Sequence, residues 1–498
     1  MTSSLSRTVS TDRAAGVLLG LAAGDALGAG YEFGPPLPDD APVGMIGGGT
    51  FNWAPGEWTD DTSMAVPIAQ AAARGADLRD EAVLDEIVAA WITWARTASD
   101  VGIQTRAVLA EAARNGGTAA AARTASQALH ERTGRSAGNG SLMRTAPVAL
   151  AFLGDEAGAA EAALTLSALT HWDDDAGDAC VIWTLAIRHA VLTGAVDARI
   201  GLAALPADRR ERWGALLDEA EKLEPRDFDR NGWAVQALQG AWSSIHRARA
   251  AHSAGDATAG RALRDGAALV DGLERAVRGG RDTDTVAAIA GGLLGATFGA
   301  SAVPSHWRLA LHGHPGLRAH DLVELAALAA RGGEPDPTGW PTTKRMEYKS
   351  YGVLRGLTQH PRDEGVLLGA ILDLDDAPAG AVVSLCRIGV EQRRATDHVE
   401  IWLIDDADPE KNPNLDLVLR DAADAVAAFR AQGKTVLLHC VQAQSRTPSV
   451  AALYAALHRD VPIERALREV VAALPAASPQ PFLREAVTRI AAAEPHGN

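Results

Sequence analysis

Two acidic segments of similar composition, far apart in the chain, each precede an apolar helical run. They are Trp58-Thr-Asp-Asp-Thr62 and Arg281-Asp-Thr-Asp-Thr285. One such segment alone would indicate a helix N-cap, because Asp and Thr often begin helices. Packing the four carboxylates of both segments together in a helical core would be costly unless cations occupied the site. Oxygen ligands favour a hard ion such as Mg²⁺ or Mn²⁺ over zinc.

A reactive thiol is indicated by a motif nearer the C-terminus, His439-Cys-Val-Gln-Ala-Gln-Ser-Arg446, set between an apolar run and a helical run. Loop amides and a helix N-terminus would hold a phosphate and stabilise Cys440 as a thiolate. Arg446 would grip two phosphate oxygens. Cys440 would attack phosphorus to give a phosphocysteine, and Thr447 would ease its departure. The alternative is a buried, inert cysteine.

Composition limits the classes of function. The 498 residues leave room for several domains. Acidic residues outnumber basic ones 63 to 47, so a net charge of −16 makes a nucleic-acid partner unlikely. The three cysteines, Cys180, Cys386 and Cys440, are too few and too scattered for a disulfide framework. We therefore expect a reducing, cytoplasmic setting, and the Ala- and Arg-rich composition suggests a bacterial source.

The elements that must position these residues change in type along the chain. From residue 12 to about 330, Ala/Leu-rich stretches with helical spacing predominate, for example Val83 to Ala95 and Ala176 to Thr193. A Pro/Gly-rich stretch, 332–341, then indicates a linker, and we expect the domain boundary near 335–345. Beyond it, β-type runs alternate with helical runs, which is typical of an α/β layer domain. The predicted β-type runs are Val366–Ile371, Val382–Leu385, Val399–Ile404 and Thr435–His439, and the helical runs are Leu415–Ala431, Thr447–Leu457 and Ile463–Ala473.

The predicted fold class is therefore multidomain: an all-α domain over 12–335 followed by an α/β domain over 346–498. Near the start, the apolar run Gly16 to Ala23 resembles a secretory leader but is too short to span a membrane, and we expect no membrane partner. Glycines at 16, 20, 24 and 28 recur every four residues, so one face of a helix would be smooth. A buried first helix is the better interpretation.

Six motifs in the first domain occur in the order and spacing of the ADP-ribosylglycohydrolases, and the chain resembles that family over roughly 12–330. Within it, the chain looks like the dinitrogenase-reductase-activating glycohydrolases. The resemblance implies an all-helical fold with two Mg²⁺ or Mn²⁺ ions, whose ligands by motif would be Thr59, Asp60, Asp61, Asp282, Asp284 and Thr285. The motifs are Gly24-Asp-Ala-Leu-Gly28, Gly56-Glu-Trp-Thr-Asp-Asp-Thr62, Asp100-Val-Gly102, Gly138-Asn-Gly-Ser-Leu-Met-Arg144, Thr170-His171 and Asp282-Thr-Asp-Thr285.

Removal of ADP-ribose breaks a glycosidic bond, and a metal pair can hold ribose hydroxyls and activate a water. By resemblance, Asp100 and Glu32 would share the proton transfers, in an order left open. The remaining residues expected at the substrate are Gly102, Gly138, Asn139, Gly140, Ser141 and His171, with glycine amides facing a diphosphate. For Arg144, contact with substrate and support of the loop stay equally open, and Trp58 and Trp172 either stack on adenine or pack internally.

Residues 350–495 resemble the dual-specificity protein phosphatases, which carry a general-acid Asp at a strand end before the cysteine. Three candidates lie there, Asp405, Asp406 and Asp408, of which we favour Asp406. The family commonly has Gly where this chain has Ala443, and Ala fits the loop if its φ stays negative.

The leading hypothesis is a bifunctional hydrolase that removes ADP-ribose from a modified acceptor and hydrolyses phosphate monoesters. Its partners would be an ADP-ribosylated protein or small molecule and a phosphorylated protein or small molecule. The alternative is that one domain, more readily the phosphatase-like one because of Ala443, binds phosphate or ADP-ribose without turnover. Action of both domains on small nucleotide metabolites is a further possibility.

Overall fold

A computed structural model describes residues 7–253, 261–348, 351–352, 355–394 and 397–493. The chain divides into two compact units. The helical unit consists of Met1–Ser253, Ala268–Val303 and Ala310–Pro335, and the sheet unit of Ala254–Ala267, Pro304–Leu309 and Asp336–Asn498. The functional domain ranges 12–335 and 346–498 stay predictions.

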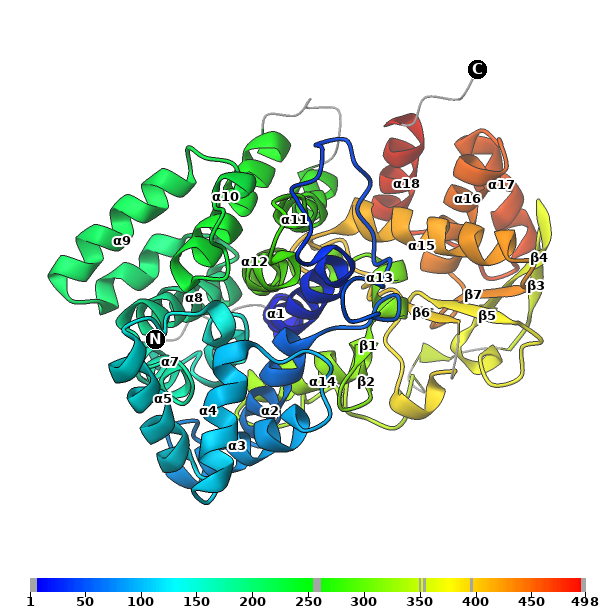
Figure 1. Ribbon diagram of the computed structural model, residues 1–498. Helices are drawn as coiled ribbons and strands as arrows, with labels where there is room; N and C mark the ends of the chain where they lie inside the picture. The colour runs from blue at the N-terminus through cyan, green and yellow to red at the C-terminus, as the bar shows by residue number, and fades with distance from the viewer. Residues whose placement is uncertain (1–6, 254–260, 349–350, 353–354, 395–396, 494–498) are drawn as a thin grey trace. The chain divides into compact units, whose positions relative to one another are not determined.

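Helices joined by loops dominate the described part of the first unit, which also contains a two-stranded ribbon of β1 (His312–Gly313) and β2 (Leu317–Arg318) (Figure 1). The predicted helical runs Val83 to Ala95 and Ala176 to Thr193 lie within α3 and α8. The helices are α1 (Arg7–Gly28), α2 (Asp60–Ala73), α3 (Glu81–Ala95), α4 (Ile103–Arg114), α5 (Ala119–Thr133), α6 (Ala146–Ala151), α7 (Glu156–Ala168), α8 (Asp174–Thr193), α9 (Ala207–Ala220), α10 (Ala234–Ser253), α12 (Thr283–Phe298) and α14 (Ala319–Ala329); α11 (Arg261–Arg278) and α13 (Ser305–Ala310) have residues in both units.

Helices α1 and α12 cross the middle of this unit side by side, in opposite directions (Figure 1). The smooth face predicted for α1 is the contact surface: a Cβ atom on Gly20 would lie 2.2 Å from the carbonyl oxygen of Gly291. At the other end of the contact, a Cβ on Gly28 would lie 2.4 Å from the Cα of Asp284. Only glycine permits this approach of two backbones, so the sequence spacing sets the distance between the two helices.

The predicted burial of the first helix is confirmed. By length and composition, Thr11–Tyr31 could cross a membrane, and 89% of the apolar window is buried inside the structure. The core helix of a packed unit meets the same criteria.

The second unit is built on a five-stranded sheet with the order β3-β4-β7-β5-β6. The pairs β4–β7, β7–β5 and β5–β6 are parallel, whereas β3 is an antiparallel edge. Their bounds are β3 (Thr358–His360), β4 (Asp363–Ala370), β5 (Ala381–Ser384), β6 (His398–Glu400) and β7 (Val436–Cys440).

One face of the sheet is covered by helices and the other by irregular chain. Side chains alternate along β7: Val436 and Leu438 pack against the helices, and Leu437 packs on the opposite face beside Ile371 and Ile388. The helices are α15 (Leu415–Ala431), α16 (Arg446–His458), α17 (Ile463–Ala473) and α18 (Pro481–Ala493). The predicted runs Leu415–Ala431 and Ile463–Ala473 coincide with α15 and α17.

The predicted strand over Val399–Ile404 is too long, because β6 ends at Glu400. The Leu403 carbonyl accepts a hydrogen bond from Arg446 Nη1 at 2.8 Å. The backbone N–H of Ile404 donates to Asn412 Oδ1 at 2.9 Å. Side chains therefore form hydrogen bonds with the backbone groups that would pair with a neighbouring strand if β6 were longer.

Candidate metal and phosphate sites

Three elements of the helical unit bring carboxylates to one buried point. Asp25 lies on α1, Asp61 in the first turn of α2, and Asp284 in the first turn of α12. One carboxylate oxygen from each lies within 4.8 Å of the others, and Asp284 forms a second such group with Glu32 and Asp282. The two acidic segments of the sequence therefore meet, because α1 and α12 are in contact where α2 begins.

Asp25 was not among the predicted site residues, although it stands inside the first motif. Its Oδ1 accepts hydrogen bonds from the N–H and Oγ1 of Thr59, both at 2.8 Å. Its Oδ2 accepts from the N–H of Thr62 at 2.9 Å and from the Thr62 hydroxyl at 2.6 Å. Asp25 thus caps α2 from a neighbouring helix, a role that only the tertiary packing reveals.

The hydroxyls of the predicted ligand set face the same oxygens. Thr59 Oγ1 lies 3.2 Å from Asp61 Oδ2 and 3.4 Å from Asp284 Oδ2. Thr285 Oγ1 lies 3.4 Å from Asp61 Oδ2. The other oxygen of Asp61, Oδ1, is buried and has no hydrogen-bond partner among the described residues. A buried carboxylate oxygen without a donor is the feature expected of a cation ligand.

Burial and mutual repulsion disfavour charge on this cluster. Desolvation, followed by the charges of neighbouring acids, raises the pKa of Asp60, Asp61 and Asp284 well above its usual value. The same causes raise the pKa of Glu32 to about 9, and Asp282 has the largest effect among the neighbouring acids. A bound divalent cation would stabilise the ionised carboxylates, so the residues fit the hard ions that the sequence predicts.

Glu32 belongs to the second carboxylate group, with Asp282 and Asp284, whereas Asp100 belongs to neither group. Burial and the charge of Asp282 raise the pKa of Asp100 to about 6. Oε2 of Glu32 is buried without a hydrogen-bond partner in the described ranges.

Asn139 contacts one of the predicted metal ligands. Its Nδ2 donates to Asp282 Oδ2 at 2.8 Å and to the carbonyl of Asn231 at 2.9 Å. Asn231 in turn donates to the carbonyl of Gly280 at 3.0 Å. Asn139 therefore orients Asp282, and Asn231, which no sequence pattern indicated, holds the segment that precedes α12.

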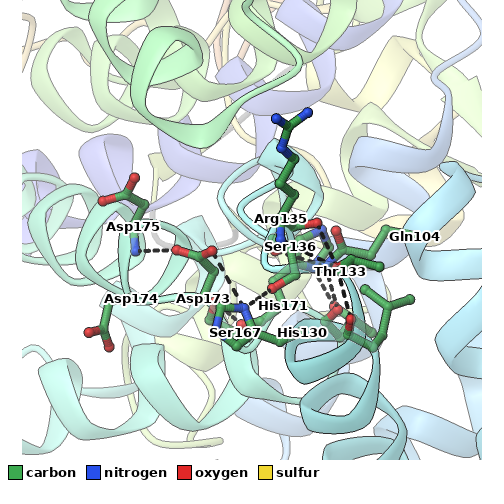
Figure 2. A network of polar contacts seen from close by, with 12 residues as sticks. Gln104, His130, Thr133, Arg135, Ser136, Ser167, His171, Asp173, Asp174 and Asp175 are labelled. Carbon is green, nitrogen blue, oxygen red and sulfur yellow. Dashed lines mark hydrogen bonds and ion pairs between the residues drawn. The ribbon is translucent and has the colours of Figure 1, made fainter.

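The glycines of the Gly138–Ser141 segment make room for His171. A Cβ atom on Gly138 or Gly140 would lie 3.2 and 3.1 Å, respectively, from the imidazole ring. The ring is buried in the network of polar contacts that Figure 2 shows, in which Gln104 donates to the carbonyls of Ser136 and Thr170, both at 2.9 Å. Ser141 is buried and accepts a hydrogen bond from Ser167 at 2.9 Å, whereas Gly102 caps α4 with its backbone.

Two of the open alternatives are decided by burial. Arg144 is 1% exposed, and its guanidinium lies 3.9 Å from the ring centroid of Trp91, so it supports the loop from within. Trp58 is also 1% exposed and donates to the carbonyl of His314 at 3.2 Å, which makes it a packing residue. Trp172 is 38% exposed.

In the sheet unit, Cys440 ends β7 and Arg446 begins α16, as the motif predicts. Both side chains are buried. Arg446 Nη1 donates to the carbonyls of Leu385 and Leu403 at 2.9 and 2.8 Å. Its Nε and the hydroxyl of Thr447 are buried without hydrogen-bond partners in the described part of the chain.

Of the three candidate acids, Asp405 lies at the loop. It accepts a hydrogen bond from Ser445 at 2.8 Å, and one of its oxygens lies 3.8 Å from Arg446 Nε. The favoured Asp406 instead pairs with Lys411, which lowers its pKa, and Asp408 is exposed and bonds to the next turn of the chain. The structure thus brings Asp405, and not Asp406, to the cysteine loop.

Ala443 has a φ of 57°, in the left-handed region. The condition under which Ala would fit, a negative φ, is therefore not met, and the loop keeps a glycine-like backbone at a cost of about 1–2 kcal/mol.

A chain of hydrogen bonds leads from the neighbouring strands to Cys440. The N–H of Arg394 donates to His398 Nδ1 at 3.0 Å, so His398 carries its hydrogen on Nε2, which donates to Ser384 Oγ at 2.7 Å. Ser384 then donates to His439 Nε2 at 2.6 Å, and His439 Nδ1 lies 3.3 Å from the Cys440 carbonyl. Burial lowers the pKa of both histidines to about 3.

Comparison with known proteins covers mainly the helical unit. The family model described as ADP-ribosylglycohydrolase matches residues 6–337. "ADP-ribosylarginine hydrolase Tri1" of Pseudomonas putida (strain GB-1) is 32% identical over 306 residues, which is 59% of this chain and 73% of that protein. "ADP-ribosyl-[dinitrogen reductase] glycohydrolase" of Rhodospirillum rubrum is 30% identical over 301 residues, 59% of this chain and 89% of that protein.

A solved structure resembles a smaller part of the chain. The crystal structure of human DUSP28 is 21% identical and covers 28% of this chain and 96% of its own, with a TM-score of 0.25.

Proposed function

The chain belongs to the ADP-ribosylglycohydrolase family, and on that premise we propose that its helical unit releases ADP-ribose from modified arginine side chains of a protein, using two divalent cations. The arginine linkage, which the sequence left open, is supported by the relative from Pseudomonas putida that is named for it. The observation that carries the proposal is the buried meeting of Asp25, Asp61 and Asp284 within 4.8 Å.

The residues that would hold the cations are those of the predicted set: Thr59, Asp60, Asp61, Asp282, Asp284 and Thr285. Bound there, Mg²⁺ or Mn²⁺ would offset the carboxylate charges and supply an activated water at neutral pH. Asp25 keeps the start of α2 in place, and Asn139 fixes the orientation of Asp282. Glu32 and Asp100, adjacent to this set, would take the proton from water and give one to the departing nitrogen.

The test is release of ADP-ribose from an ADP-ribosylarginine peptide, with a serine-linked peptide as comparison, in Mg²⁺, in Mn²⁺ and in EDTA. We expect arginine-linked turnover that EDTA abolishes, and loss of Mn²⁺ binding in Asp61→Asn. Asp178→Asn is the matched control, because Asp178 is a buried aspartate bonded to Trp213, away from the cluster. Turnover that persists in EDTA, or unchanged Mn²⁺ affinity in Asp61→Asn, would overturn the assignment.

A second activity, cysteine-dependent hydrolysis of phosphate monoesters, is favoured by one observation in the sheet unit. Arg446 Nε and Thr447 Oγ1 are buried donors without hydrogen-bond partners within the described residues, at the loop that follows β7. An anion held there would satisfy both, next to the Cys440 thiol. Asp405, which lies at the same loop, would serve as the general acid.

Hydrolysis of an aryl phosphate tests this second activity. We expect Cys440→Ser to abolish turnover and Cys386→Ser, the matched change of another buried cysteine, to retain it. Asp405→Asn should reduce kcat about 100-fold or more, whereas Asp406→Asn should leave it within a few-fold. Binding of phosphate by the parent protein without turnover would instead support a recognition module.

A further inference from the structure

The hydroxyl of Thr170 lies between two buried side chains of the helical unit. Arg144 Nη2 donates to Thr170 Oγ1 at 2.7 Å, and the same oxygen lies 2.7 Å from Nδ1 of His171. None of the three residues is more than 3% exposed. A guanidinium has donors and no acceptor, so the direction of the bond from Arg144 is fixed.

The hydroxyl hydrogen of Thr170 then has one available acceptor. No acceptor other than His171 Nδ1 lies within hydrogen-bond reach of this hydroxyl among the described residues. If Nδ1 carried a hydrogen of its own, the Thr170 hydroxyl hydrogen would be buried without a partner, which is costly. Nδ1 is therefore the acceptor, and the neutral imidazole carries its hydrogen on Nε2.

His171 stays neutral in this setting. Burial, followed by the nearby charge of Arg144, lowers the pKa of His171 to about 3. The imidazole can therefore offer a hydrogen bond through Nε2 without bringing a second positive charge beside Arg144.

Nε2 of His171 faces the segment that carries Asn139. A Cβ atom on Gly138 would lie 3.2 Å from Nε2, and one on Gly140 would lie 3.3 Å from it. Asn139, between the two glycines, binds Asp282 of the carboxylate cluster. Among the described residues no protein acceptor is hydrogen-bonded to Nε2, which leaves this donor for a ligand beside the segment that carries Asn139.

We propose that Arg144 and Thr170 are positioning residues that hold His171 in its Nε2–H form, so that this hydrogen bonds to an oxygen of the ADP-ribosyl group. Gln104 completes the arrangement by binding the carbonyls of Thr170 and Ser136, which ties the histidine to the loop that it faces (Figure 2). The part that concerns substrate rests on the proposed glycohydrolase function. The assignment of the tautomer does not.

The tautomer can be observed directly in the full-length, Mg²⁺-loaded protein labelled with ¹⁵N-histidine. Long-range ¹H–¹⁵N spectra show which ring nitrogen bears the hydrogen, and the His171 signals are identified by their absence in His171→Gln. We expect hydrogen on Nε2 alone at neutral pH. A charged ring, or hydrogen on Nδ1, in the parent protein would overturn the proposal.

Thr170→Val tests the relay, meaning the hydrogen bonds from Arg144 to Thr170 and from Thr170 to His171, because it removes the hydroxyl and keeps the shape of the side chain. We expect mixed tautomers at His171 and a KM about 10-fold higher with kcat within twofold, which is the loss expected for one ground-state hydrogen bond. Thr170→Ser should restore both the spectrum and KM. Thr145→Val is the control, since Thr145 bonds to Thr184 at 3.1 Å and forms no hydrogen bond to His171.

Two failures are separable. A parent protein that shows the Nε2–H form but releases no ADP-ribose would refute the proposed function and leave the relay intact. A Thr170→Val protein with an unchanged His171 spectrum would refute the relay, whatever the activity.

Discussion

Replacing Gly291 by Ala should separate the two central helices and weaken the proposed cation site. A Cβ at this position would lie 2.0 Å from the Gly20 carbonyl oxygen and 2.6 Å from its carbonyl carbon, whereas ordinary Cβ contacts begin near 3.4 Å. The obstacle is backbone, which cannot rotate away, so α1 and α12 must move apart by well over an ångström. Overpacking of this kind costs about 3 kcal/mol, offset by about 1 kcal/mol of better helix propensity.

Gly292→Ala is the matched control on the same helix. Its Cβ would meet Ala146 Cβ at 3.2 Å and Ile187 Cδ1 at 3.4 Å, both of which are side-chain atoms. We expect this variant to match or exceed the parent in stability, because the same propensity gain meets little resistance. The two alanine variants should therefore differ by about 3 kcal/mol.

The assay is thermal unfolding, following the transition that Mn²⁺ shifts, together with Mn²⁺ titration by calorimetry. Gly291→Ala should lower the midpoint by about 5 °C and weaken Mn²⁺ binding about tenfold or more, because Asp25 and Asp284 move with their helices. If Gly291→Ala kept the parent's stability and Mn²⁺ affinity, or if Gly292→Ala were equally harmful, the glycine contact would not set the site.

Three further results are expected. In EDTA the pKa of Glu32 is raised to about 9, so between pH 4.5 and 9 the folded protein binds more protons than the unfolded chain and its stability falls as pH rises. The free energy of unfolding of Glu32→Gln should exceed that of the parent by up to about 3 kcal/mol at pH 7 and equal it at pH 4. A difference that does not vary with pH would contradict this. The pKa of His398 is lowered to about 3, so below pH 6.5 the unfolded chain binds more protons and stability falls with acidification. In urea unfolding, the free energy of unfolding of His398→Gln should fall by about 2 kcal/mol less than that of the parent between pH 7 and 5. Equal losses would contradict the buried neutral state. Ala443→Gly should raise the stability of the sheet unit by about 1 kcal/mol, since its φ of 57° suits glycine, and a destabilised variant would show that the alanine methyl is packed rather than strained.

Much of the fold could be predicted because it depends on local patterns. Apolar spacing alone predicts α15 and α17 to their end residues, and the four-residue glycine repeat predicts that α1 has a face for close packing. The same reasoning extends β6 too far, since apolar side chains say nothing about the Arg446 and Asn412 groups that take its last backbone partners.

The candidate sites were predicted unevenly for the same reason. The predicted ligands Asp61 and Asp284 stand in recognisable segments, whereas Asp25 binds α2 across a helix contact that no local pattern encodes. In the cysteine loop, Asp405 and Asp406 are adjacent in sequence and indistinguishable by spacing. A hydrogen bond from Ser445 and an ion pair with Lys411 separate them in space.

The sequence by itself determined the family, the two kinds of unit and the residue types able to bind cations or attack phosphorus, because these follow from composition, periodicity and motif order. It could not determine which oxygens are left without donors, which acid contacts the cysteine loop, or which groups surround the His171 ring. Those depend on distances of about 3 Å between residues remote in the chain. The packing of α1 against α12, of β7 beside β5, and of Thr170 against Arg144 decided them.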